Sequence, residues 1–496
     1  MMALFLTGYL LLILTFTLSL STFGVGAAGR WPDVVAQELG PQLSPLASII
    51  TQSEAVESDF ERWSAYSAPQ PGVVVSVATE EDVAKTVKFC ISNSIQFLAQ
   101  NGGHGWADTF DLGPNGRGLL IDITHLNAVV FNANRTQVTL GGGVSIGEVV
   151  AAAVEHDTLV PTGNCNCVGT LGAVLGGGYG NLLGMVGFGV DNVLEMNVVL
   201  ADGEVHTVTP GQDKDHDLFW ALRGAGPNYG IVTSATLKAY PVESAANITA
   251  WMGQLVFSGE QVETVVQAVG ELSLTPEMNI FLYYMTENGT QRLIATPFYF
   301  GDEGEARGRA AFASLLDIGP IEDRTAEVPY ARWNEGSNGF CTSGGYKPAY
   351  SAALRRLVPG TWKMAWDEYV AFTAVEGTQN SVVIMEAYSL DMARSLPDDT
   401  SAFPGRSRVN FQAVAIPWYY DSGVENSAIA WGETMRALWW ETDGLDDPAA
   451  YVNFAHGDEN LTTIYGENVG RLRAIKARVD PGNVFNQWFN LGTGHP

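Results

Sequence analysis

The chain has 496 residues, of which 46% are hydrophobic and 16% charged, and its formal net charge is −28. This length and apolar content are enough for two domains with a large core, and so low a charged fraction excludes a disordered, solvating chain. An acidic surface without a Lys/Arg cluster to offset it repels nucleic acid and anionic membranes.

The N-terminal residues 1–28 are predicted to be a secretory signal peptide. An apolar stretch covers residues 10–20 and small residues follow at 24–29, although no Lys or Arg precedes the stretch. The small-residue tract makes a membrane anchor the weaker alternative, and no later segment is long and apolar enough to span a bilayer. We therefore expect a secreted monomer without membrane contact after cleavage. Four sequons agree with N-glycosylation in the secretory pathway: Asn134, Asn247, Asn288 and Asn460.

Short strands and helices alternate from residue 69 to residue 242, which predicts an α+β domain. A lead-in of helix and loop is expected before it, at residues 31–67. Asp202-Gly203 is a strong hairpin signal between two of the strands. The predicted strands are residues 73–77, 95–99, 118–123, 137–140, 194–200, 204–208 and 231–240, and the predicted helices are residues 80–93 and 146–156.

A second, aromatic-rich region is predicted over residues 243–450, as an antiparallel sheet covered by helices. Its expected strands are residues 279–285, 291–300, 381–388 and 408–417, and its expected helices include residues 304–316 and 426–440. Residues 451–496 form a short C-terminal segment.

Two glycine-rich loops each carry a nucleophile. His104 lies in the loop of residues 100–105, and Cys165 lies in the loop of residues 163–169. Glycine lets the backbone approach a ligand closely, so these loops suit a flat, phosphate-bearing cofactor to which the protein bonds. Cys90, at helical spacing from two valines, is predicted to be a buried core thiol.

Other motifs favour other chemistries less strongly. Ser145 lies in a G-x-S-x-G sequence with His156, His206 and His216 downstream, which leaves a serine hydrolase as an alternative. Against it, the chain lacks a long alternation of parallel strands and helices. Cys165 and Cys167 are too close in sequence for the usual zinc spacing and no second pair accompanies them, so no metal site is predicted.

Several longer motifs occur together along the chain. They are Gly102-Gly103-His104, Gly163-x-Cys165-x-x-Val168-Gly169, Gly176-Gly177-Gly178-Tyr179-Gly180, Asp191-Asn192-Val193, Asp217-Leu218-Phe219-Trp220-Ala221-Leu222-Arg223-Gly224, Phe403-Pro404-Gly405-Arg406 and Tyr451-Val452-Asn453-Phe454. With these motifs in this order, the chain resembles the berberine-bridge-enzyme-like branch of the vanillyl-alcohol oxidase superfamily, which includes fungal glucooligosaccharide oxidases. The resemblance implies a PCMH-type FAD-binding domain at residues 69–242, a substrate domain at 243–450, and a C-terminal segment that returns to the FAD domain.

The same resemblance implies a bicovalent FAD. In that family the loop histidine, here His104, bonds to the flavin 8α-methyl, and the loop cysteine, here Cys165, bonds to C6. Val168 occupies the position that controls access of oxygen to the flavin. Cys167 is unusual, and is either a spare thiol or an alternative attachment point. The further cofactor-binding positions implied are Gln100, Asn101, Gly102, Gly103, Gly105, Gly169, Gly177, Gly178, Gly180 and Ile231.

The catalytic positions depart from the family pattern. Relatives commonly have a second tyrosine where this chain has Phe454, and phenylalanine cannot act as an acid or base. Gln412 is near a position that often bears a carboxylate, and it cannot act as a base either. The candidates for the catalytic site are therefore Tyr451, Tyr388 and Glu386, with Gln412 beside them.

The replacement of two catalytic side chains of the family, by Phe454 and Gln412, indicates a substrate different from that of the sugar oxidases. We expect hydride transfer from a small, largely apolar natural product of fungal secondary metabolism to the flavin, followed by reoxidation by O2 to H2O2. An oligosaccharide oxidase that acts on the C1 hydroxyl is the main alternative. A flavin-binding protein without turnover is a further alternative, because of Phe454.

Overall fold

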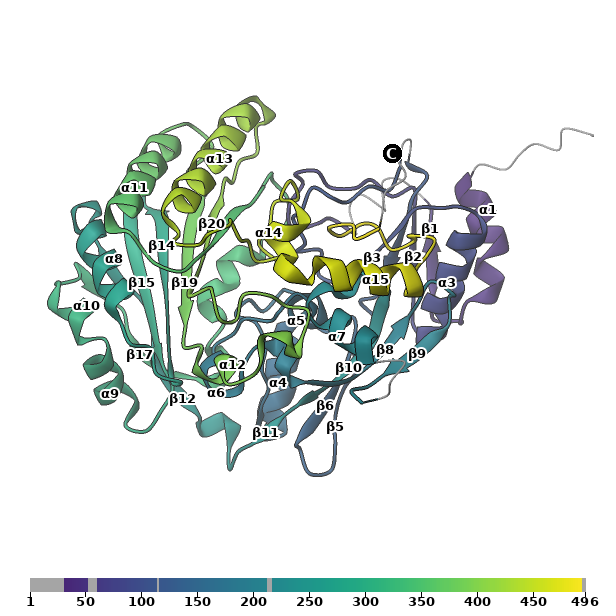
Figure 1. The fold of residues 1–496 in the computed structure, drawn as a ribbon, viewed down its shortest axis with the longest axis horizontal. Coiled ribbons are helices and arrows are strands. Elements are labelled where there is room, and N and C mark those ends of the chain that lie inside the picture. The colour runs from purple at the N-terminus through teal and green to yellow at the C-terminus, as the bar shows by residue number, and fades with distance from the viewer. Residues whose placement is uncertain (1–30, 52–59, 114–115, 212–215, 493–496) are drawn as a thin grey trace, which may run out of the picture.

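The computed structural model describes residues 31–51, 60–113, 116–211 and 216–492. Two lobes lie side by side (Figure 1): the first contains strands β1 to β11, and the second contains β12 to β20. The predicted signal peptide lies outside the described residues. No helix in the described ranges combines the length and apolar character that crossing a bilayer requires.

The first lobe is built on two main sheets. One has the strand order β1-β2-β4-β3, in which β2, β4 and β3 are parallel and β1 is antiparallel. The other is antiparallel, in the order β5-β6-β10-β8-β9, and β7 pairs separately with β11. The strands are β1 (Ser48–Ile50), β2 (Val73–Ser76), β3 (Phe97–Gln100), β4 (Leu119–Asp122), β5 (Val129–Phe131), β6 (Gln137–Gly141), β7 (Thr158–Leu159), β8 (Val193–Val199), β9 (Val205–Val208), β10 (Ile231–Lys238) and β11 (Tyr240–Pro241).

Helices of the first lobe begin where the sequence supplies caps. Helix α3 (Glu80–Ser92) starts at a capping box between Thr79 and Asp82, and it buries Val83, Val87 and Cys90 on one face. The prediction that Cys90 is a buried core thiol is confirmed, since its side chain is inaccessible and unpaired. The other helices are α1 (Trp31–Glu38), α4 (Ile146–Glu155), α5 (Thr170–Leu175), α6 (Leu183–Val186) and α7 (His216–Ala225).

The second lobe is one large antiparallel sheet with helices α8, α11 and α13 on the face away from the first lobe (Figure 1). Its strands are β12 (Thr249–Met252), β13 (Leu255–Phe257), β14 (Met278–Glu287), β15 (Thr290–Tyr299), β16 (Glu322–Asp323), β17 (Ala326–Pro329), β18 (Tyr350–Leu354), β19 (Val382–Tyr388) and β20 (Phe411–Ile416). Its helices are α8 (Val262–Glu271), α9 (Gly304–Ala311), α10 (Ala313–Asp317), α11 (Pro359–Thr373), α12 (Asp391–Arg394) and α13 (Glu425–Thr442).

Strand alternation decides which side chains of this sheet face the first lobe. In β19, Val383, Met385 and Ala387 pack with the covering helices in one hydrophobic cluster. Because successive side chains point to opposite faces, Glu386 and Tyr388 point the other way. They line a cavity between the sheet and the first lobe.

Two of the sequence motifs connect the lobes. The guanidinium of Arg406 donates to both carboxylate oxygens of Asp191, at 2.8 and 3.0 Å, and both side chains are buried. The C-terminal helices α14 (Leu461–Tyr465) and α15 (Val469–Val479) return to the first lobe (Figure 1), where the buried amine of Lys476 donates to the carbonyl of Asn228.

The predicted α+β class is confirmed, and each predicted strand has a counterpart within a few residues. Gly203 has a φ of 71° in the predicted hairpin between β8 and β9. We retain the division at residue 242 as a proposal, supported by the change of sheet after β11.

Two expectations are corrected. Residues 31–67 include a strand, β1, which pairs with β2. The single helix expected at residues 304–316 is two helices, α9 and α10, that meet at Phe312. Helices α8 and α11 were not predicted; α11 contains several aromatic residues, which prefer strands, and it is helical because its aromatic face packs in the core.

Candidate active site

A cavity of about 440 Å³ lies between the two lobes. Its walls come from the loops of residues 100–106 and 163–169, from helix α5, from the inward face of β14, β19 and β20, and from the C-terminal segment. Convergent elements and a mostly apolar lining with few polar groups are typical of a cofactor or substrate site.

His104 lies in the loop that follows β3. Gly103, which precedes it, has a φ of 68°, a conformation that favours glycine. The imidazole stacks on Trp63 with ring centroids 5.7 Å apart. Burial lowers the pKa of His104 to about 4, and the nearby cations of Lys347 and Arg62 act in the same direction. The ring is therefore neutral at physiological pH and keeps a lone pair for bond formation.

Lys347 is a buried cation behind this histidine. Its amine lies 4.3 Å from the ring centroids of both Trp63 and Trp418 and donates to the carbonyl of Trp63 at 2.6 Å. Burial lowers the pKa of Lys347 to about 8, which Glu61 partly offsets. No local pattern in the sequence points to this residue, since an isolated lysine far along the chain has no motif around it.

The second glycine-rich loop positions Cys165 in the cavity wall. The amide of Asn101, in the first loop, donates to the carbonyls of Gly142 and Val144 in the turn after β6, at 3.0 and 3.2 Å. The two loops meet at Gly169, where an added Cβ atom would lie 2.6 Å from the Asn101 amide and would displace that side chain. Burial raises the pKa of the Cys165 thiol, and the thiol is protonated at neutral pH.

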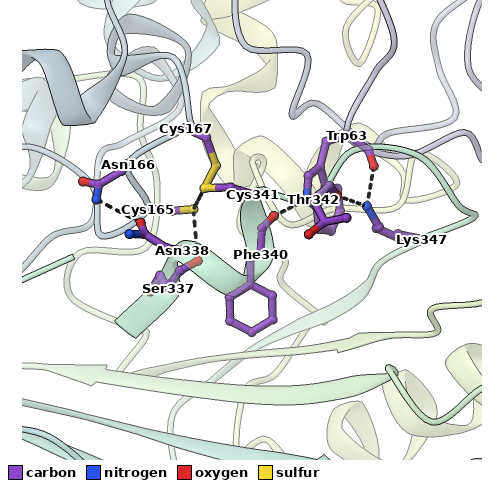
Figure 2. Close-up of a disulfide and its surroundings, with 10 residues drawn as sticks. All are labelled: Trp63, Cys165, Asn166, Cys167, Ser337, Asn338, Phe340, Cys341, Thr342 and Lys347. Atoms are coloured by element: carbon purple, nitrogen blue, oxygen red, sulfur yellow. Dashed lines mark hydrogen bonds between the residues drawn. A yellow bond between two sulfur atoms is a disulfide. The ribbon is translucent and has the colours of Figure 1, made fainter. Parts of the chain in front are cut away.

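Cys167 is bonded to Cys341 in a disulfide (Figure 2). The prediction of a spare thiol at Cys167 is therefore wrong. The bridged residues are 174 positions apart, and only the fold of the second lobe brings Cys341 to this loop. The sulfur of Cys165 lies 3.5 Å from that of Cys167 and 4.0 Å from that of Cys341. We assign no metal to this group, since a disulfide supplies no thiolate ligands.

Glu386 lies on the opposite wall, in β19. It accepts a hydrogen bond of 2.9 Å from the hydroxyl of Tyr388, which in turn accepts one of 2.9 Å from the amide of Asn164. Burial raises the pKa of Glu386 to about 7, while the Tyr388 hydrogen bond acts in the opposite direction. A carboxyl group that titrates near neutrality inside a cavity can take up and release a proton.

Known proteins resemble the chain over nearly its whole length. A family model described as "FAD binding domain" matches residues 71–209, and one described as "Berberine and berberine like" matches residues 450–490. The FAD-linked oxidoreductase OXR1 of Pyricularia oryzae is 35% identical, over 93% of this chain and 92% of its own. The chain belongs to the berberine-bridge-enzyme-like FAD-linked oxidoreductases.

Solved structures of this family share the fold. A glucooligosaccharide oxidase of Acremonium strictum has a TM-score of 0.79 at 19% identity, covering 94% of this chain and 99% of its own. A berberine-bridge-enzyme-like protein of Physcomitrella patens has a TM-score of 0.78 at 20% identity, covering 91% and 97%. The expected PCMH-type fold is thereby confirmed, and the protein is an enzyme, an FAD-linked oxidoreductase.

The lining of the cavity fits FAD. Glycine backbone forms much of one wall, and a Cβ built at Gly172 would have no atom within 4 Å, which leaves room for a flat ring. The indole nitrogen of Trp106 is buried in this wall without a partner among the described residues. The expected residues that line the cavity are Gln100, Asn101, Gly102, Gly103, His104, Gly105, Cys165, Val168, Gly169, Ile231, Glu386, Tyr388 and Tyr451.

Four expected residues lie outside the cavity lining: Gly177, Gly178, Gly180 and Gln412. The amide of Gln412 donates at 2.9 Å to the hydroxyl of Tyr179, which does line the cavity. Gly178 has a φ of 80°, and its N–H donates to the hydroxyl of Tyr451 at 3.3 Å. A Cβ at Gly180 would lie 1.7 Å from the carbonyl of Thr162. Gly178 and Gly180 thus take part in close contacts of the backbone beside the cavity.

The hydrolase alternative is not supported by the surroundings of Ser145. Its hydroxyl caps helix α4, and it donates to the carboxylate of Glu148 at 2.8 Å. His156 contacts a helix carbonyl at Ala152 and His206 pairs with Asp202, away from the serine. Serine at this position starts a helix, which accounts for the sequence motif.

Proposed function

We propose that this enzyme is an oxidase that removes a hydride from an alcohol or activated C–H group of a small, largely apolar natural product. Bound FAD would supply the hydride acceptor of this reaction, and O2 would take up the two electrons as H2O2. His104 and Cys165 would hold the cofactor by two covalent bonds. The observation that carries the proposal is that Glu386, with a pKa near neutrality, shares one cavity with His104 and Cys165.

Glu386 is the proposed general base. As a carboxylate it would take the proton of a substrate hydroxyl, and the Tyr388 hydroxyl holds it in position. Tyr451 is a weaker candidate: burial raises its pKa well above that of free tyrosine, and its hydroxyl accepts hydrogen bonds from Gly178 and Asn453. A carboxylate in β19 makes a base at position 454 unnecessary.

The cavity lining favours an apolar substrate. Tyr283, Ile384, Val414 and Phe454 line the same cavity as Glu386, and three of these four side chains offer no partner for the hydroxyl groups of a sugar. A site selects a polyhydroxylated substrate through several hydrogen-bonding groups, and it leaves them unpaired when the substrate is apolar. An oligosaccharide remains the second candidate, favoured by the shared fold with the glucooligosaccharide oxidase.

The proposal that the enzyme is an oxidase, and not a dehydrogenase, also concerns Val168. The Val168 side chain is partly buried in the cavity wall, in the same loop as Cys165. Valine at this position would leave a passage for O2 next to the flavin, which supports oxidase activity over dehydrogenase activity.

Secretion is also proposed. The Cys167–Cys341 disulfide is typical of an oxidising compartment. The asparagines of all four sequons are exposed, as glycosylation requires: Asn134, Asn247, Asn288 and Asn460. A lower apparent mass after treatment of the secreted protein with an endoglycosidase would support this proposal, and a protein retained in cell extracts without glycans would contradict it.

The test of function is anaerobic reduction of the purified enzyme. Lipophilic alcohols and oligosaccharides are mixed with it separately while the flavin absorbance is followed, and H2O2 is measured on admission of air. Bleaching by lipophilic alcohols alone supports the proposal. Rapid bleaching by a sugar would make the enzyme a carbohydrate oxidase. A flavin that dithionite reduces but no donor bleaches would support the alternative without turnover.

A further inference from the structure

The three sulfur atoms beside the cavity form a group in which only one is a thiol. Cys165, Cys167 and Cys341 have sulfur atoms within 4.8 Å of one another, and the last two are bonded (Figure 2). Cys90, the other thiol, is buried in helix α3 of the first lobe and does not line the cavity.

Cys341 comes from a segment of the second lobe that covers the Cys165 loop. This cover segment, residues 334–342, includes the 3-10 turns of Glu335–Cys341. Asn338 accepts a hydrogen bond of 3.0 Å from Asn166, and the carbonyl of Ser337 lies 3.9 Å from the Cys165 sulfur (Figure 2). The carbonyl of Phe340 accepts a hydrogen bond from the indole of Trp63. The disulfide therefore lies within an extended set of contacts.

We propose that the Cys167–Cys341 disulfide selects the thiol that bonds to FAD. This inference depends on the proposed flavin linkage of the loop. Cys165 and Cys167 belong to one turn, closed by a hydrogen bond of 3.3 Å from the Val168 N–H to the Cys165 carbonyl. Their sulfur atoms are 3.5 Å apart, so a free thiol at either position would be close to the same ligand. A sulfur in a disulfide is not a nucleophile, which leaves Cys165.

The bond between Cys165 and the flavin can form with O2 as the sole oxidant. The Cys165 thiol and an aromatic C–H group of the flavin lose two protons and two electrons as one carbon–sulfur bond forms. One O2, the oxidant that the proposed reaction already uses, takes them up as H2O2. The Cys167–Cys341 bond neither forms nor breaks in this step, so its role is to keep Cys167 out of it.

The test locates the flavin on the loop. FAD-loaded wild type and the Cys341→Ser variant are unfolded and alkylated, and fragment-ion mass spectrometry of the peptide that carries residues 163–169 assigns the flavin to one cysteine. In wild type we expect it on Cys165 alone. In Cys341→Ser about half should move to Cys167, because two similar thiols then compete. Cys90→Ala, which changes a distant thiol, should match wild type.

A second variant keeps the test decisive if Cys341→Ser does not fold. In Cys165→Ser the disulfide is retained, and FAD should bond to Cys167 only after reduction by dithiothreitol. Linkage to Cys167 without reduction, or none after it, would overturn the proposal, as would flavin confined to Cys165 in Cys341→Ser. If the wild-type protein carries no flavin on this loop, the bicovalent linkage is contradicted. The proposal that the disulfide selects Cys165 is then contradicted as well.

Discussion

The cavity has two walls that differ in how they hold reactive groups. The loop wall, residues 100–106 and 163–169, fixes His104 and Cys165 through glycine backbone, close contacts between the loops and a disulfide. The sheet wall, formed by β14, β19 and β20, holds Glu386 by strand pairing and sets its pKa by burial. Substitutions in the loop wall should therefore change cofactor attachment, and those in the sheet wall should change turnover or pH dependence.

The largest expected effect is the loss of turnover when Glu386 of the sheet wall is replaced. Glu386→Gln keeps the shape of the side chain and removes the proposed base, so turnover with the reactive donor should fall by about 10²–10⁴-fold. Flavin content and its covalent attachment should be unchanged, as measured from the absorbance of the denatured protein. A variant that keeps more than about a tenth of the wild-type rate would exclude Glu386 as the base.

The loop wall is tested by Gly102→Ala. A Cβ at residue 102 would lie 2.7 Å from the carbonyl of Cys167 and 3.2 Å from the N–H of Gly169, so the two loops would have to separate. We expect a loss of roughly 1–3 kcal/mol in the free energy of unfolding and lower covalent flavin content. Gly360→Ala, where a Cβ meets nothing within 4 Å, is the control. Full flavin content in Gly102→Ala would contradict the importance of this contact.

The burial of Glu386 should also change how the free energy of unfolding depends on pH. Its pKa is about 7 in the folded protein against 4.5 in a free side chain, so the folded state binds more protons between these values. This contribution to stability is present below pH 4.5 and is lost as the pH rises through 7. Glu386→Gln should therefore gain stability relative to wild type from pH 4.5 to 7, by an amount on the order of 1–3 kcal/mol. Urea unfolding of both proteins at pH 4 and pH 8 measures the difference, and an equal difference at both would contradict the buried carboxyl.

The same two walls explain what the sequence could predict. His104 and Cys165 lie in short glycine-rich motifs, and Glu386 and Tyr388 follow from alternation in one predicted strand, so all were found as candidates. Lys347 and the Cys167–Cys341 pair were not, because their neighbours lie far away in the sequence and only the fold brings them together. Gln412 lies in a predicted strand, β20, but its side chain donates to Tyr179 of the cavity wall and does not itself line the cavity. Local patterns thus identify which residues are reactive, and tertiary packing decides which of them share a cavity.

The smallest expected effect comes from Tyr388→Phe. The Tyr388 hydroxyl donates to Glu386 and opposes the rise in pKa that burial causes. Without it the pKa of Glu386 should rise further, so a smaller fraction is ionised at pH 7 and the rate there falls by a few-fold. The rate at high pH, where the carboxyl is ionised in both proteins, should be nearly equal. A pH–rate profile of Tyr388→Phe measures this, with Tyr420→Phe, an exposed tyrosine, as the control. A uniform loss at every pH would instead mean that the Tyr388 hydroxyl contacts the substrate, and would assign it a catalytic role of its own.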